Sequence, residues 1–276
     1  MELPLFFQGP ALQVDRPAPP PAHPVAADLG RLVRKLQHGA FLSATDVKAL
    51  EGSVTLVREI GAHEDIIKEG DRPELVHVVL EGFACRYKLL PDGSRQIIAW
   101  LVPGDFCDLH IAILGRMDHS IATLSASKLA LIQPESVMGL TQVSPGLSRA
   151  LWWASLVDEA VLREWLVGMG RRSAERQIAH LFCELHLRLQ AVGLARENLL
   201  VMPVTQAELA DTVGMSAVHV NRTVQHLRAE GLIGWRGKML SILDVDGLRA
   251  FASFDPNYLH LDKREERPPG HRDRKS

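Results

Sequence analysis

A short stretch near residue 220 carries side chains of the types that read DNA bases. The candidate readers are Val218, His219, Asn221, Arg222 and Gln225. Arginine and amide side chains hydrogen-bond to base edges in a major groove, and an apolar side chain can pack on a thymine methyl group. Val220, Val224 and Leu227 recur at helical spacing on the opposite side. The stretch therefore predicts an amphipathic helix with one buried face and one face free to enter a groove.

The residues before this helix predict a helix-turn-helix. Thr205 and Glu208 have the spacing of a capping box, in which each side chain bonds the other residue's backbone N–H. Gly214 supplies the turn, and Ser216 is the N-cap of the second helix. We expect Thr205, Gln206 and Ser216 to contact the DNA backbone. A generic pair of packed helices would share part of this pattern, but the order of cap, turn and amphipathic helix favours DNA binding.

The next segment predicts a wing. Residues 232–242 read as two short strands around Arg236 and Gly237, which leaves Arg236 and Lys238 available to phosphates. Between 216 and 238 four Lys and Arg residues face one Glu, whereas residues 41–140 hold nine Lys and Arg against fourteen Asp and Glu. A basic end on an acidic chain fits a polyanionic partner, although a solvated surface would give the same counts.

The sequence pattern of the first half of the chain predicts an antiparallel β-roll. Short β-branched runs predict strands over 54–60, 65–71, 75–82, 83–90, 94–101 and 121–132. Glycine and proline turn signals such as Gly70, Gly82 and Pro103 separate them. Two short helices are expected between 28 and 50, the second capped by Ser43. We therefore expect an α+β fold with a jelly-roll-like domain.

A long helix should follow Pro145. Its apolar stripe consists of Leu147, Leu151, Ala154, Val161 and Trp165. Flanking apolar residues such as Trp152 and Leu156 make the helix apolar on more than one face, so it needs burial on two sides. We predict that the stripe forms a dimer seam on a helix that also covers the β-domain, and that Asp158, which interrupts the stripe, fixes the register; a core helix is the alternative. Gly168 and Gly170 then indicate a hinge or a helix corner.

These signals divide the 276 residues into parts. We expect a disordered Pro-rich tail (1–27), a β-roll (28–143), a dimerisation helix (144–170), a winged helix-turn-helix (171–255) and a charged tail (256–276). Neither a secretory signal nor a membrane-spanning run is indicated. Three widely spaced cysteines suit a reducing cytoplasm. No nucleophile–base pair supports an enzyme, and no metal site is assigned.

The whole order resembles the Crp/Fnr family of bacterial transcription regulators, over roughly residues 30–255. The motifs that carry the resemblance are EGD (69–71), LEG (80–82), DG (92–93), PGDF (103–106) and the module 204–242. The resemblance implies a cyclic-nucleotide-binding-like β-roll, a dimer helix and a winged helix-turn-helix. It further implies a homodimer that binds palindromic promoter sites in double-stranded DNA and contacts RNA polymerase.

The chain departs from the family members that bind cyclic AMP or an iron–sulfur cluster. The former carry Gly-Glu after the PGDF turn, where this chain has Asp108 and Leu109. At the position of the phosphate-binding arginine stands Met117 or His119, depending on the gap, with Arg116 close by. Iron–sulfur members use an N-terminal cysteine cluster, and no cysteine precedes Cys85. Both cofactors are therefore disfavoured, and the effector is unknown.

An effector pocket, if present, should lie around the PGDF turn. Its candidate residues are Phe106, Cys107, Asp108, His110, Arg116 and His119. A metal or redox site at Cys107 and haem ligation by His77 are alternatives, whereas Cys183 is expected to be a buried inert thiol. The start of the second helix of the helix-turn-helix also differs from the family pattern. Many members carry an Arg-Glu pair where this chain has Ala217-Val218, whereas the later arginine is present as Arg222.

The sequence thus predicts a cytoplasmic, homodimeric, sequence-specific DNA-binding transcription regulator that does not depend on cyclic AMP. The alternative is a small-molecule or redox sensor module that acts through a protein partner and carries a vestigial helix-turn-helix.

Overall fold

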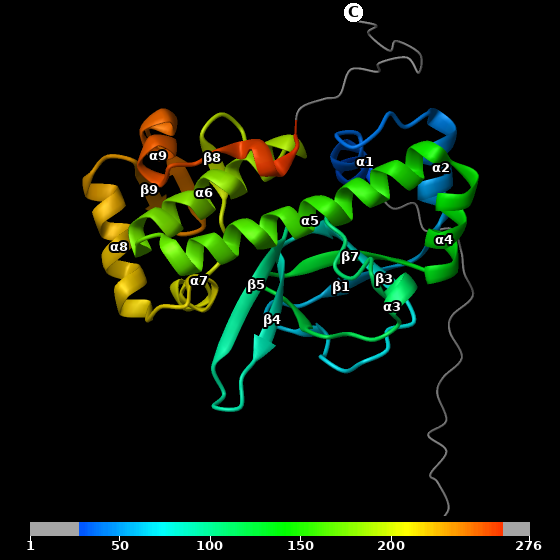
Figure 1. Cartoon of the computed structure of the whole chain (residues 1–276), viewed down its shortest axis with the longest axis horizontal. Coiled ribbons are helices and arrows are strands. Elements are labelled where there is room, and N and C mark those ends of the chain that lie inside the picture. The colour runs from blue at the N-terminus through cyan, green and yellow to red at the C-terminus, as the bar shows by residue number, and fades with distance from the viewer. Residues whose placement is uncertain (1–27, 262–276) are drawn as a thin grey trace, which may run out of the picture.

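The computed structural model describes residues 28–261, and the predicted tail at 1–27 lies outside them. The described chain consists of an antiparallel β-roll, a long helix across it, and a C-terminal helix-turn-helix with a small sheet (Figure 1). The expected α+β fold is confirmed.

Two antiparallel sheets face each other in the roll. The three-stranded sheet has the order β1 (Val54–Ile60), β7 (Ser127–Ile132), β3 (Val76–Glu81), and the four-stranded sheet β2 (Asp65–Ile67), β6 (Ser120–Thr123), β4 (Ala84–Leu89), β5 (Arg95–Leu101). The single strand predicted over 121–132 is wrong, because β6 and β7 lie in different sheets. The chain bends between them, where Leu124 N donates to Phe83 O (2.7 Å) and Ser125 Oγ accepts from Phe83 N (3.0 Å).

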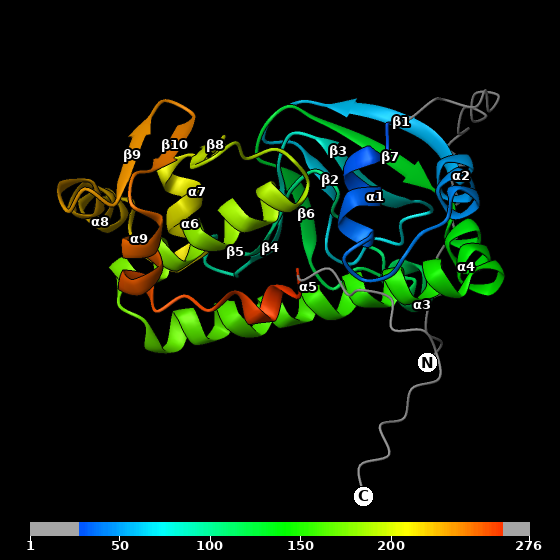
Figure 2. The ribbon, with the colours of Figure 1, turned by 90° about the horizontal axis from the view of Figure 1, so that it is seen from above.

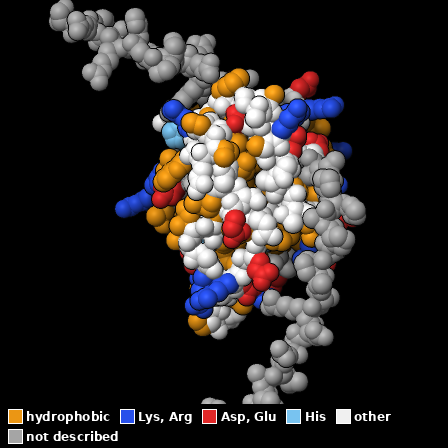
Figure 3. Space-filling view, turned by 90° about the vertical axis from the view of Figure 1, so that its right-hand side faces the viewer, with side chains coloured by type: hydrophobic (Ala, Val, Ile, Leu, Met, Phe, Trp, Pro, Cys, Tyr) orange, Lys and Arg blue, Asp and Glu red, His pale blue; other side chains and the backbone are white. Residues whose placement is uncertain are grey.

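Short helices close the roll. Helices α1 (Gly30–Leu36) and α2 (Ala44–Gly52) precede it, and α3 (Ile111–Leu114) and α4 (Pro134–Val143) were not anticipated. The predicted cap of α2 is confirmed, because Ser43 Oγ accepts from Asp46 N (3.2 Å) and Asp46 Oδ2 accepts from Ser43 N (2.9 Å). Figure 3 shows the end of the molecule that α2 and α4 form, where apolar side chains are scattered among neutral and charged ones.

Helix α5 (Pro145–Arg171) crosses the molecule in front of the β-roll in Figure 1, and Figure 2 shows that it runs along one edge. The stripe predicted to form a dimer seam is buried inside the chain's own core: Leu147, Leu151, Ala154, Val161 and Trp165. That assignment is wrong, because the roll and the following helix already cover this face. Asp158 sets no register there, since its Oδ2 accepts a hydrogen bond from Arg86 of β4 (3.0 Å).

The opposite face of α5 carries the exposed apolar side chains. Trp152, Leu156, Leu162 and Leu166 are 50–66% exposed. They lie within about half a turn of one another around the helix axis, as expected for residues spaced by four and ten positions. We call these four residues the outer stripe of α5.

The C-terminal part begins with α6 (Ala174–Ala191). The extended backbone of Arg172 separates it from α5, and Ser173 is its N-cap. Its remaining elements are β8 (Leu199–Val201), α7 (Gln206–Val213), α8 (Ala217–Ala229), β9 (Ile233–Arg236), β10 (Met239–Ile242) and α9 (Val245–Ala252). The sheet order is β8-β10-β9. Sequence patterns missed β8 and α9.

The charged tail predicted from residue 256 is wrong for residues 256–261. Pro256–Leu259 form a 3-10 helix, η1, capped by Asp255. Leu259 is buried, and Tyr258 Oη donates to Glu184 Oε2 of α6 (2.9 Å). Apolar burial and this hydrogen bond hold the segment, which local charge content could not indicate. Within residues 28–261, no helix combines the length and apolar character that a membrane crossing requires.

Candidate functional site

The local signals of the helix-turn-helix are confirmed. Thr205 Oγ1 accepts from Glu208 N (3.1 Å), and Glu208 Oε2 accepts from Thr205 N (2.7 Å). Gly214 ends α7 in the left-handed region (φ 68°), which a glycine adopts without the Cβ clash of other residues. Ser216 Oγ accepts from His219 N (3.3 Å) at the start of α8. These bonds set the direction in which α8 leaves the turn.

Helix α8 has the two faces that its spacing predicts. Val220, Val224 and Leu227 are buried. The five predicted base readers, Val218, His219, Asn221, Arg222 and Gln225, are all exposed. Val218 is 70% exposed, an unusual position for a β-branched apolar residue on a helix.

Side-chain contacts order part of this exposed face. Asn221 Nδ2 donates to Gln206 Oε1 at the start of α7 (2.9 Å), and Arg228 donates to Gln225 Oε1 (3.1 Å). Among the residues that the structure describes, Arg222 has no hydrogen-bond or ion-pair partner. Its guanidinium is therefore free for an external acceptor, whereas Asn221 would have to leave Gln206.

The wing lies next to α8. Gly237 turns the chain between β9 and β10 (φ 56°), and Arg236 and Lys238 flank it on the surface. A groove of about 560 Å³ separates α8 from the wing, and Arg228 and Arg236 are among its lining residues. The predicted backbone contacts Thr205, Gln206 and Ser216 are exposed as well. Arg228 was not singled out as a site residue, although its charge was counted.

The first helix of the motif is fixed to the β-roll. Trp100 Nε1 donates to Thr212 Oγ1 (2.9 Å), and both residues are buried. Arg95 forms an ion pair with Asp211 (2.8 Å), and His63 Nδ1 lies 3.1 Å from Glu208 Oε1. Strand β5 therefore contacts α7 directly through Trp100 and Arg95. No local sequence signal indicates these pairs, because their members are more than 100 residues apart.

A cavity of about 300 Å³ lies where β4 and β5 face α5. Of the six predicted effector-pocket residues, His110 and His119 line it. Phe106, Cys107 and Asp108 are buried and are not among the lining residues. Arg116 lies elsewhere on the surface, where its Nε donates to Gly70 O (3.1 Å).

Sequence reasoning missed the cavity's central cation, Arg86. Its guanidinium donates to Cys107 O and Phe106 O (both 2.9 Å) and to Asp158 Oδ2 (3.0 Å). These bonds tie β4 to the PGDF turn and to α5. Only the interruption of the apolar stripe at Asp158 hinted at this partner.

Cys107 and His77, the residues of the redox and haem alternatives, are both buried. Asp108 accepts from His77 N (2.6 Å), its other oxygen lies 2.8 Å from His77 Nδ1, and neither residue is among those that line the cavity. Burial raises the pKa of the Cys107 thiol well above its ordinary value, which disfavours the reactive thiolate. Burial likewise raises the pKa of Cys183 to about 12, in line with the expected inert thiol.

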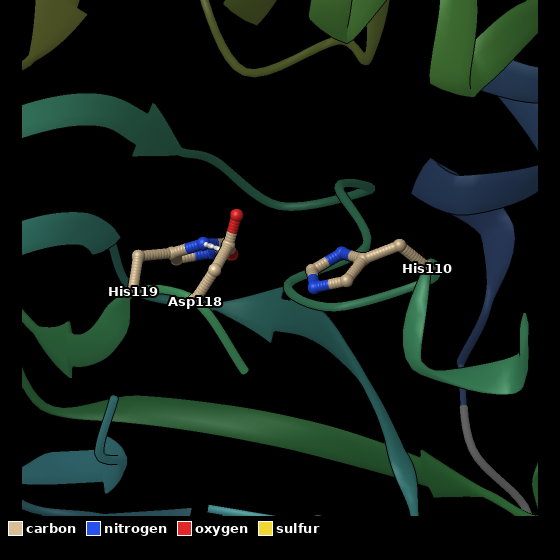
Figure 4. Close-up of side chains that lie close together, drawn as sticks. All are labelled: His110, Asp118 and His119. Carbon is tan, nitrogen blue, oxygen red and sulfur yellow. Dashed lines mark hydrogen bonds and ion pairs between the residues drawn. The ribbon is translucent and has the colours of Figure 1, made fainter. Parts of the chain in front are cut away.

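Three side chains at the cavity form a group of their own. His110, Asp118 and His119 place one ligand atom each within 4.8 Å of one another (Figure 4). His119 Nδ1 bonds Asp118 Oδ1 (2.6 Å), and the two imidazole centroids are 5.4 Å apart. Burial and the nearby Arg86 charge lower the pKa of both imidazoles, so both are neutral near pH 7.

Two family models match the chain: a cyclic nucleotide-binding domain over 57–143 and a Crp-like helix-turn-helix domain over 176–251. The nitrogen fixation regulation protein FixK of Bradyrhizobium diazoefficiens is 28% identical over 79% of this chain and 92% of its own. The transcriptional activator protein FnrL of Cereibacter sphaeroides is 26% identical over 74% and 83%. The solved structure of FixK2 from Bradyrhizobium japonicum superposes with a TM-score of 0.65 at 22% identity, covering 71% of this chain and 96% of that one.

Proposed function

Since the chain belongs to the Crp/Fnr family of DNA-binding transcription regulators, we propose that it acts as a homodimer that reads a palindromic promoter site. The observation that carries this proposal is the exposed face of α8, with Arg222 unpartnered among the described residues. Arg222 reads a guanine through O6 and N7, Val218 packs on a thymine methyl, and His219, Asn221 and Gln225 reach neighbouring bases. Arg236 and Lys238 bind phosphates from the wing.

The outer stripe of α5 supports the dimer. Four apolar side chains that are at least half exposed lie on one face of a helix at the edge of the molecule (Figure 2). A second copy of α5 would cover them in a two-fold arrangement, in which the same surface serves both protomers. The dimer axis would then set the two α8 helices on half-sites roughly 34 Å apart. RNA polymerase, in the cytoplasm, is the further partner that family membership suggests.

We also propose that cyclic AMP is not the effector. The carboxylate at position 108 is bonded to His77, and position 109 is a leucine. Both arginines that line the cavity are occupied: Arg86 donates to three acceptors, and Arg188 donates to Asp105 and Glu184. Arg116 lies outside the cavity. A buried phosphate would lack a free cation, which is costly. Calorimetry should detect no saturable binding of cyclic AMP, and binding in the micromolar range would contradict this proposal.

The alternative, a sensor with a vestigial helix-turn-helix, is not favoured. Both helix caps and the Gly214 turn are formed, and the face of α8 is open. Intact helix caps together with an exposed polar face on α8 are expected of a helix-turn-helix that binds DNA.

The test compares Arg222→Ala with Lys238→Ala on DNA selected from genomic fragments by the wild-type protein. We expect Arg222→Ala to lose about 1–3 kcal/mol of preference at one G·C pair per half-site. Lys238→Ala should weaken binding to specific and to random DNA equally. It should also lower the number of counterions released on binding by about one, which is seen as a shallower salt dependence. Competition titrations at several salt concentrations measure both. An unchanged ratio of specific to random binding for Arg222→Ala would show that α8 does not read the groove as proposed.

A further inference from the structure

The cavity between the roll and α5 holds two histidines whose hydrogen bonding is incomplete. His110 Nε2 and His119 Nε2 are both buried and have no hydrogen-bond partner among the described residues. His119 as a residue is only 9% exposed. A buried polar atom without a partner destabilises the folded state, so two such atoms at one place indicate a ligand.

The contact of His119 with Asp118 defines what that ligand must be. A carboxylate at Nδ1 (2.6 Å) holds the proton on that nitrogen. Nε2 then carries a lone pair and no proton, so it can accept a hydrogen bond or bind a cation but cannot donate a hydrogen bond. The same carboxylate–imidazole arrangement orients metal-binding histidines in proteins generally. A phosphate or carboxylate ligand would find no donor at this atom.

We propose that His110 and His119 bind a divalent transition-metal ion through their imidazole nitrogens, while the Asp118 carboxylate, bonded to His119 Nδ1, holds that ring and supplies negative charge beside the ion. Two imidazole ligands suit Zn²⁺ or Fe²⁺ and disfavour Ca²⁺ and Mg²⁺, which prefer all-oxygen ligands. Ion binding pairs both orphaned nitrogens. Figure 4 shows the two imidazoles on either side of Asp118.

The surroundings allow such an ion. Bond lengths of about 2.1 Å in a tetrahedral site place two ligand nitrogens roughly 3.4 Å apart, so ligand atoms that lie within 4.8 Å of one another must approach by up to about 1.4 Å. Asp118 is largely exposed, and His110 is the N-cap of the four-residue helix α3 and makes no capping bond with its side chain, so both side chains can move. The cavity of about 300 Å³ leaves room for water as a further ligand.

The charges that face the site nearly cancel. Arg86 is the nearest cation, and its ion pair with Asp158 (3.0 Å) offsets its repulsion of a metal. Glu159 of α5 also lines the cavity, with its carboxylate 3.1 Å from Arg163. Arg188 lies at the same cavity, paired with Asp105 (2.7 Å) and Glu184 (3.1 Å), and Lys35 pairs with the other oxygen of Asp105 (2.5 Å), so these four charges balance. The Asp118 carboxylate is thus the charge left for the ion.

The test uses the full-length protein stripped with a chelator, without DNA, so its result is independent of the proposed DNA-binding function. Zn²⁺, and Fe²⁺ under anaerobic conditions, are titrated by calorimetry, and Co²⁺ is followed by its visible absorbance. We expect one ion per chain, with visible bands typical of mixed nitrogen and oxygen ligands.

Substitutions locate the ion. His110→Gln and His119→Gln should each weaken binding at least 100-fold, and Asp118→Asn should weaken it 10–100-fold. His226→Gln, at an exposed histidine on α8, is the matched control and should leave binding unchanged. Thermal melting of the metal-free proteins checks that each variant folds. Millimolar binding only, or binding that survives both histidine substitutions in folded protein, would overturn the proposal.

Discussion

His180 of α6 is a buried histidine in a setting that opposes its protonation. Its ring packs on Phe254 (centroids 4.8 Å apart) and Tyr258 (5.8 Å), and its Nε2 lies 3.3 Å from a Glu164 carboxylate oxygen. Burial and the positive charge of Arg172 together outweigh Glu164 and lower the pKa of His180 to about 4. The folded state therefore binds a proton at this site less readily than the unfolded chain does.

This difference predicts acid sensitivity. Between pH 6.5 and about 4 the unfolded chain protonates His180 before the folded protein does, so the contribution of His180 to stability falls as pH falls. The loss is on the order of 3 kcal/mol across that window. In denaturant titrations at a series of pH values, His180→Gln should flatten this part of the stability profile. His226→Gln, at an exposed site, should keep the wild-type slope.

The residues that sequence reasoning located correctly are those with local partners. Thr205 and Glu208, three positions apart, form the predicted capping box, and Gly214 takes the predicted left-handed turn. Arg86 and Asp158 are 72 residues apart, and neither has a neighbour in sequence that indicates the other. The cavity depends on such distant pairs. Only His110 and His119 were placed there in advance.

At the level of the element, α5 shows where periodicity stops being informative. The sequence indicates correctly that this helix is apolar on two faces, but it cannot tell which face the chain covers itself. The stripe from Leu147 to Trp165 packs inside the molecule, and the outer stripe stays exposed. Assigning a face requires the position of the β-roll, which is set by strand pairings far away in sequence.

Leu166→Glu tests the outer stripe. A charge on this two-thirds exposed position leaves the core intact but places two like charges across the proposed dimer axis. We expect the dimer dissociation constant to rise at least tenfold in sedimentation experiments, with weaker binding to a palindromic site. Leu89→Glu is the matched control, because Leu89 is similarly exposed (61%) at the end of β4 and away from α5. Equal dissociation of both variants, or of neither, would contradict the proposed interface.

Across the whole molecule, a buried polar network joins the roll to the C-terminal part. Arg188 of α6 donates to Asp105 in the PGDF turn (2.7 Å) and to Glu184 (3.1 Å). Burial alone would raise the pKa of Asp105, but the charges of Lys35 and Arg188 outweigh it and lower that pKa. Together with the contacts of β5 on α7, this network fixes the helix-turn-helix relative to the cavity.

A double-mutant cycle measures one of these contacts. Trp100→Phe removes the indole N–H that Thr212 Oγ1 accepts, and Thr212→Val removes the acceptor. Since both groups are buried, we expect a coupling energy of about 1 kcal/mol in denaturant titrations. Trp235→Phe should be additive with Thr212→Val, because the indole of Trp235 bonds Gly237 O within the wing. Additivity of the first pair would show that the bond does not contribute to the docking of α7.

Trp100 of β5 lines the cavity and also donates a hydrogen bond to Thr212 of α7, so ion binding in the cavity and DNA binding by the helix-turn-helix can be coupled through this strand. If an ion at His110 and His119 changes the affinity for DNA by some factor, then DNA must change the affinity for the ion by the same factor. An operator that binds the ion-loaded form more tightly would therefore raise the affinity for the ion and the chelator concentration needed to remove it. A promoter-bound protein would retain its ion at concentrations that empty the free protein, so the response to metal depletion would differ from one promoter to the next.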